Sequence, residues 1–182
     1  MILCDRDLHK LVFPEKYSVT HPPPLLSPCE ESLINPASVD IRVGNSGIRE
    51  SEIMYFNGQR DTGWEPFSLE SFTQSYPLQI NPGQVILLST LETINVPNGY
   101  AIDLRLKSSV ARAGWNHALA FWFDPGWSGV GTMELQNITR YQTLTLWSGM
   151  RIAQVIVHRL SGPADKPYAG RYQGAMSVEG AK

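Results

Sequence analysis

Short apolar runs separated by turn residues constrain the fold of this chain more than any other feature. The chain holds 15 glycines and 13 prolines, and Gly, Pro, Asn or Ser residues recur between the runs. The runs that read as strands cover residues 39–43, 78–80, 85–91, 101–106, 118–123, 132–135, 143–147 and 152–157. Many short strands at this spacing, with one brief helix between them, predict a mainly β fold: a distorted β-barrel or jelly-roll-like body.

Turn residues set the ends of several predicted strands. Asn81-Pro82-Gly83 places proline and glycine where a tight turn prefers them, and residues 94–99 predict the next turn. Gly44-Asn45 is interpreted as the turn that ends the first strand. Residues 47–76 are polar and irregular, so we expect short strands joined by variable loops there.

The first 37 residues differ from the rest of the chain. An acid-rich, amphipathic stretch at 5–12 predicts a short helix, which Pro14 ends. The prolines from Pro22 to Pro36 indicate a rigid surface loop, with a proline-rich ligand for a partner domain as the alternative. Since there is no repeat or linker, we expect one domain over 1–182, with a β body at 38–160 and a C-terminal tail at 161–182.

Composition narrows the classes of partner. The formal net charge is -2 and 42% of the residues are hydrophobic, which is typical of a globular protein and gives no broad basic surface for nucleic acid. The first residues carry acids where a signal peptide needs a cationic end, and no apolar run approaches the ~20 residues that span a bilayer. We therefore expect a cytoplasmic protein with no membrane partner.

Cysteine and histidine residues give no pattern of a metal site. Cys4 and Cys29 are the chain's 2 cysteines, and we expect both to be thiols in a reducing compartment. No Cys-x-x-Cys or His-x-Glu sequence occurs, and the 4 histidines are scattered. A zinc site of the Cys/His type is therefore not expected.

A group of hydroxyls and cations at 107–112 carries the clearest chemistry. If Ser108 to Arg112 forms one helical turn and a half, Ser108 and Arg112 share a face, and Ser109 and Arg112 lie three apart. Hydroxyl donors beside a guanidinium, with Lys107 just before them, suit a phosphorylated anion. A solvated capping turn with an ordinary basic residue is the alternative.

Two carboxylates and the tail complete the candidate site. Asp124 follows a predicted strand and begins a tight turn, while alternation places Glu134 on the face opposite Met133 and Leu135. A turn-capping aspartate and an exposed strand glutamate are the alternatives; together with the 107–112 group, the two acids would form an acid/base set without metal ligands. Residues 166–177 are either a disordered terminus or a lid over bound phosphate.

Several stretches, taken in order, resemble the dCTP deaminase and trimeric dUTPase superfamily over nearly the whole chain. They are residues 3–7, 38–45, 108–112, 124–129, the strand around Glu134, 149–154 and 160–168. The resemblance implies a dUTPase-type fold and trimers or hexamers with sites between subunits. It also implies a nucleotide bound with Mg²⁺ on its phosphates and a reaction that needs no zinc.

The resemblance implies a role for each matching residue. Glu134 matches the general base that activates water to attack C4 of cytosine, and Ser108 and Arg112 match residues that hold this water and the pyrimidine edge. Asp124 matches the acid that meets the deoxyribose 3'-hydroxyl and, in dUTPases, activates water toward the α-phosphate. The remaining matches are the backbone of Thr132 and Met133, which reads the pyrimidine, and the triphosphate contacts Lys107, Ser109, Gln154, Tyr168 and Arg171.

Departures from the family pattern leave the exact reaction open. Lys107 stands where most dCTP deaminases carry arginine, and Ala175 where a further glutamine is usual. Phe121-Trp122 replaces a His-Arg pair of the deaminases that stop at dUTP. We therefore expect a dCTP deaminase that forms dUTP and ammonia, with continuation to dUMP and inhibition by dTTP left open. A dUTPase without deamination, or a non-catalytic dNTP-binding regulator, are the alternatives.

Overall fold

The computed structural model describes residues 1–50, 64–117 and 122–180. Its helices are α1 (Asp5–Val12) and α2 (Ser108–Arg112), with 3-10 turns at Pro14–Lys16 and Glu31–Leu33. The strands are β1 (Leu26–Ser27), β2 (Ile34–Asn35), β3 (Ser38–Glu50), β4 (Trp64–Ser68), β5 (Leu78–Ile80), β6 (Val85–Asn95), β7 (Tyr100–Leu106), β8 (Trp115–His117), β9 (Trp122–Phe123), β10 (Ser128–Asn137), β11 (Leu144–Leu146) and β12 (Arg151–Arg159).

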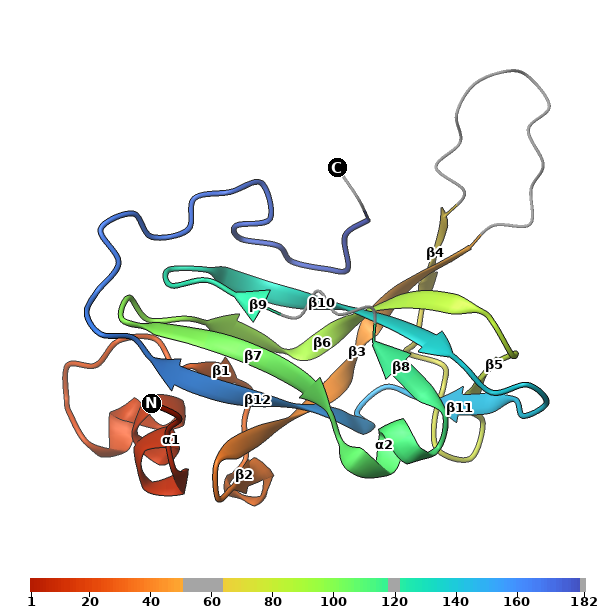
Figure 1. Ribbon diagram of the computed structural model, residues 1–182, viewed down its shortest axis with the longest axis horizontal. Helices are drawn as coiled ribbons and strands as arrows, with labels where there is room; N and C mark the ends of the chain where they lie inside the picture. The colour runs from red at the N-terminus through yellow and green to blue at the C-terminus, as the bar shows by residue number, and fades with distance from the viewer. Residues whose placement is uncertain (51–63, 118–121, 181–182) are drawn as a thin grey trace.

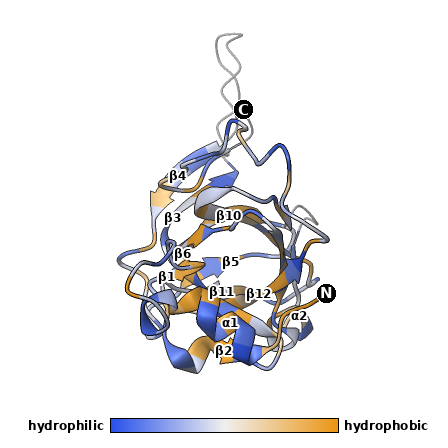
Figure 2. Cartoon of the chain, turned by 90° about the vertical axis from the view of Figure 1, so that its left-hand side faces the viewer, coloured by the Kyte–Doolittle hydropathy of each residue, from blue (hydrophilic) through white to orange (hydrophobic). Residues whose placement is uncertain are grey.

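The described strands form one curled antiparallel sheet and a separate pair, β11 with β5. The main path of the sheet runs β8-β10-β6-β3-β12-β7-β9, with β1 on β6 and with β2 and β4 on β3. Viewed end-on, the strands curl around an interior toward which the apolar stretches of β6, β10 and β12 face (Figure 2). This arrangement confirms the prediction of a mainly β, barrel-like body with a short N-terminal helix and a short central helix.

Strand β3 joins the two halves of the curled sheet. Residues 39–42 pair with β12, whereas residues 47–49 pair with β6, and the register shifts between Val43 and Gly47. A Cβ on Gly44 would lie 2.4 Å from Ser89 Oγ and 2.6 Å from the carbonyl oxygen of Thr90. The prediction that Gly44-Asn45 ends the strand was wrong, because here glycine marks an irregular register and a close backbone approach inside a continuous strand.

Most other predicted strands are confirmed, with changed ends. β6 is longer than predicted and continues through Asn95, because its last residues pair with β1 and β10. The turn at Asn81 is present, with Gly83 at φ 83° and the amide of Gln84 donating to the carbonyl of Asn81. The predicted strand at 118–123 is described only as β9, and residues 51–63 and 118–121, including Phe121, lie outside the described residues.

The N-terminal segment packs on the sheet through α1. Leu8 and Val12 of this helix are buried in the core, and the amide of Leu3 donates to the carbonyl of Val157 in β12. The proline-rich loop contains two two-residue strands, β1 and β2, so it is less irregular than predicted. Cys4 and Cys29 are free thiols, and burial raises the pKa of Cys29 to about 11. In the described part of the chain, no helix is long and apolar enough to span a membrane.

Candidate functional site

A cavity of about 540 Å³ lies between β9, β10 and the C-terminal tail. Alternation along β10 places it, because Met133 and Leu135 are fully buried in the core while Thr132 and Glu134 face the other way and line the cavity. Asp124, at the end of β9, and Tyr168, in the tail, line it as well. The structure thus brings four of the predicted site residues together.

Glu134 lies in an apolar part of this cavity. Its register partner on β6 is Leu87, which lines the same space, as does Val85. Burial raises the pKa of the Glu134 carboxyl, and its Oε2 atom is buried without a hydrogen-bond partner among the described residues. A desolvated carboxylate with a raised pKa holds a proton more readily near neutral pH, which is what a general base needs.

The C-terminal tail forms one wall of the cavity. The amide of Tyr168 donates to the carbonyl of Pro125, the amide of Val130 donates to the carbonyl of Ala175, and the amide of Glu179 donates to Thr132 Oγ1 at 3.1 Å. Figure 1 shows the tail running back over β9 and β10. These contacts place the described part of the tail along one wall of the cavity.

The 107–112 group lies elsewhere on the same chain. In Figure 1, α2 is at the lower edge of the sheet, whereas β9, β10 and the tail are at the upper side. Ser108, Ser109 and Arg112 are exposed there, and none of them lines the cavity. The described residues that line the cavity include no lysine or arginine. One copy of the chain thus separates the hydroxyl and cation group from the carboxylates.

The remaining predicted residues lie at three further places. Lys107, just before α2, donates to Asp40 Oδ2 at 2.5 Å, and Asp40 is buried in β3. Gln154, on β12, accepts a hydrogen bond from Ser38 Oγ at 3.3 Å. Arg171 is exposed in the tail. The side chain of Met133 packs in the core, so only its backbone is free to face a ligand.

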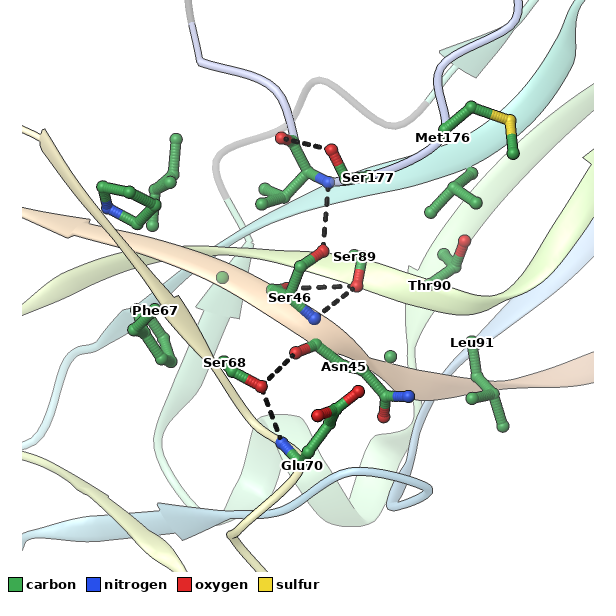
Figure 3. A pocket seen from close by; sticks show the side chains of 16 residues that line it. Asn45, Ser46, Phe67, Ser68, Glu70, Ser89, Thr90, Leu91, Met176 and Ser177 are labelled. Carbon is green, nitrogen blue, oxygen red and sulfur yellow. Dashed lines mark hydrogen bonds between the residues drawn. The ribbon is translucent and has the colours of Figure 1, made fainter.

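A second cavity, of about 700 Å³, is lined by tail residues 176–178 and by residues of β3, β4 and β6 (Figure 3). Its hydroxyls are already paired: Ser89 Oγ donates to the carbonyl of Ser46 at 3.0 Å, and Ser46 Oγ accepts from the amide of Val178 at 3.2 Å. Ser68 Oγ likewise accepts from the amide of Glu70 at 3.2 Å. These groups hold β3, β6, β4 and the tail together and leave little for a ligand.

Several residues of the first cavity were not identified from the sequence as site residues. They are the aromatic residues Trp64, Trp122, Phe123, Trp127 and Tyr172, and the tail residue Glu179. Trp122, Phe123, Trp127 and Tyr172 lay within stretches that the sequence had marked, whereas Trp64 and Glu179 stand in segments without a motif. Among the described residues, no group of three or more His, Cys, Asp or Glu side chains is placed to hold a metal ion.

A model of the dCTP deaminase-like family matches residues 2–160. The chain belongs to this family. Relatives include a "dCTP deaminase, dUMP-forming" of Mycobacterium sp. (strain KMS), which is 35% identical over 187 residues, covering 96% of this chain and 91% of that protein. The protein of the same name from Mycobacterium leprae (strain TN) is 34% identical over the same shares of the two chains.

The fold of the family is shared with a solved structure. The 2'-deoxycytidine 5'-triphosphate deaminase from Agrobacterium tumefaciens superposes with a TM-score of 0.63 at 19% identity, over 86% of this chain and 47% of that one. This chain therefore spans about half the length of that protein. The likeness confirms the mainly β fold that the resemblance implied.

Proposed function

We propose that this protein deaminates dCTP and then releases dUMP and pyrophosphate. The observation that supports this most directly is the Glu134 carboxyl, with its raised pKa, facing a cavity that Asp124 also lines. The two mycobacterial relatives, whose names include dUMP formation, support the second step.

In the deamination step, Glu134 takes a proton from water, and the water oxygen bonds to C4 of cytosine. Glu134 then returns the proton to the amino group, the bond from C4 to nitrogen breaks, and ammonia leaves. The backbone of Thr132 and Met133 reads the pyrimidine edge, and Asp124 meets the 3'-hydroxyl of the deoxyribose. A positioned water and a base of suitable pKa provide the proximity and proton transfer that this reaction needs.

The triphosphate requires positive charge that the described lining of the cavity does not supply. Ser108, Ser109 and Arg112 are exposed on α2, where a second copy of the chain could bring them to the cavity of the first. We propose such a shared site in a cyclic homotrimer, or in a hexamer built from it. Ser108 and Arg112 hold the attacking water, and Lys107, Ser109, Gln154, Tyr168 and Arg171 contact the phosphates. Mg²⁺ enters with the nucleotide, on its phosphates.

Product analysis with dCTP and Mg²⁺ tests this function. Native protein should release ammonia and accumulate dUMP and pyrophosphate, with dUTP as a transient or minor product. Ammonia with dUTP as the final product would reduce the function to deamination. Pyrophosphate from added dUTP without ammonia from dCTP would favour a dUTPase, and tight dNTP binding without turnover would favour a regulator on the same fold.

A further inference from the structure

A solvent-exposed hydrogen bond joins Trp122 to Asp124. The indole Nε1 of Trp122 donates to Asp124 Oδ1 at 3.0 Å, and both residues line the same space. An indole N–H can only donate, so Asp124 Oδ1 is the acceptor in this bond. Because Oδ1 is engaged in this way, Oδ2 is the oxygen that remains to meet a substrate or a water.

The sheet holds the ring that carries this N–H. Trp122 pairs with Asp103 of β7 across the β7–β9 ladder, and its neighbour Phe123 pairs with Ile102. The ring also packs against His158 of β12, with the ring centroids 5.8 Å apart. Because the ring is held by its neighbours, its N–H limits the rotation of the Asp124 side chain before the reaction begins. Little entropy is therefore lost at the moment of reaction.

We propose that Trp122 is a positioning residue for Asp124 in the step that releases pyrophosphate. This inference rests on the proposed function. With Oδ1 held by the indole, Oδ2 takes a proton from water while the water oxygen bonds to the α-phosphorus of dUTP. The bond from that phosphorus to the oxygen bridging the α- and β-phosphates breaks, pyrophosphate leaves, and dUMP forms.

In the deamination step Glu134 carries the proton, and Asp124 contacts only the 3'-hydroxyl of the sugar. No hydrogen bond joins Trp122 to Glu134 in the described part of the chain, and the raised pKa of Glu134 has burial as its cause. Loss of the indole N–H should therefore slow one of the two steps and spare the other, a separation that general damage to the pocket would not produce.

The test replaces Trp122 with phenylalanine, which keeps an aromatic ring and removes the N–H. For Trp122→Phe we expect kcat for dUTP hydrolysis to fall about three- to tenfold, the range expected for a partly exposed hydrogen bond to a charged group. KM for dUTP and the rate of ammonia release from dCTP should stay within about twofold of native values. Trp122 is 53% exposed, so the fold should tolerate the change, and a thermal melt checks this.

Trp147→Phe is the matched control, because Trp147 lies outside the cavity and undergoes the same exchange of rings. It should leave both steps unchanged. Native dUTP turnover in Trp122→Phe would overturn the inference while the proposed function stood. An equal fall in both steps would also overturn it, since Trp122 would then shape the pocket as a whole. If native protein formed no dUMP, the pyrophosphate step and the inference would fail together.

Discussion

The ammonium group of Lys107 lies 2.5 Å from a carboxylate oxygen of Asp40, a residue only 2% exposed. Asn35 Nδ2 donates to the other oxygen of the same carboxylate at 2.9 Å. Because Lys107 is the residue before α2, this ion pair ties the start of the helix to β3. The exposed hydroxyls and the guanidinium of α2 are thus presented from a fixed point.

Lys107→Met should destabilise the protein even without nucleotide. The change leaves the buried Asp40 carboxylate with Asn35 and with Arg151, whose guanidinium lies 3.9 Å away. We expect a loss of about 2 kcal/mol of unfolding free energy. Chemical denaturation measures it. Lys166→Met, at an exposed tail position, is the control. Unchanged stability with a raised KM for dCTP would mean that Lys107 serves the phosphates alone.

Arg42→Leu should destabilise the protein more than Lys107→Met, because it leaves the fully buried Glu92 carboxylate without its cation. Arg42 Nε donates to Glu92 Oε1 at 2.7 Å, and Glu92 is 0% exposed. Removing one partner of a buried pair costs about 3–5 kcal/mol. Adding Glu92→Gln removes the unpaired charge and keeps a side-chain oxygen that can accept a hydrogen bond from the backbone amide of residue 42. The double variant should therefore regain stability in urea unfolding, and no regain would contradict the role given to this pair.

Glu134→Gln should lower the rate of deamination and raise the stability of the protein near neutral pH. Burial raises the pKa of Glu134, so the folded state holds a proton more tightly than the unfolded chain. Stability from this group is therefore present below the unfolded pKa of about 4.3 and is lost as pH rises toward the raised folded value. We expect the variant to melt higher than native protein near neutral pH, with no such gain below about pH 4.

Ammonia release from dCTP by the same variant should fall at least about 10²-fold. Thermal melts across pH and an ammonia assay measure the two effects. Near-native ammonia release would remove Glu134 from the mechanism. A melting difference that did not change with pH would remove the electrostatic explanation of its environment.

Gly129→Ala should loosen the tail. Gly129 has φ +152°, and a Cβ there would lie 2.9 Å from both the amide nitrogen and the carbonyl oxygen of Ala175. We expect faster tryptic cleavage at Arg171 and a raised KM for dCTP. Gly162→Ala, where an added Cβ meets nothing within 4 Å, is the control and should change neither. Equal cleavage of both variants would mean that the tail does not depend on this close approach.

Local patterns predicted much of this fold and four of the residues that line the first cavity. Helix α2 and the outward face of Glu134 depend on spacing within one element, and both were predicted from the sequence. The continuation of β3 through Gly44 depends on its approach to Ser89 and Thr90, far along the chain, so a glycine inside a strand was taken for a turn. Secondary-structure propensity and hydrophobic periodicity depend on residues that are neighbours in sequence, whereas this contact forms between strands that are far apart in sequence.

The chemistry of the site was likewise predicted only in part from the sequence. The residue types were recognised, but the pairing of Lys107 with Asp40 became visible only when the strands were placed beside one another. The bond from Trp122 to Asp124 depends on the local backbone at the end of β9, which the sequence pattern did not specify. Trp64 and Glu179 come from segments with no motif, so nothing in the sequence connected them to Asp124. The distance between α2 and the cavity likewise follows from the curl of the sheet.

Mixing two inactive variants tests the shared site most directly. Glu134→Gln and Arg112→Ala, each purified and inactive, are unfolded together, refolded as a mixture and assayed for ammonia from dCTP. If the carboxylate and the guanidinium come from different copies, mixed trimers contain sites with both native residues, and about a quarter of native activity should return. A mixture as inactive as its components, although mixed oligomers have formed, would contradict a site shared between subunits.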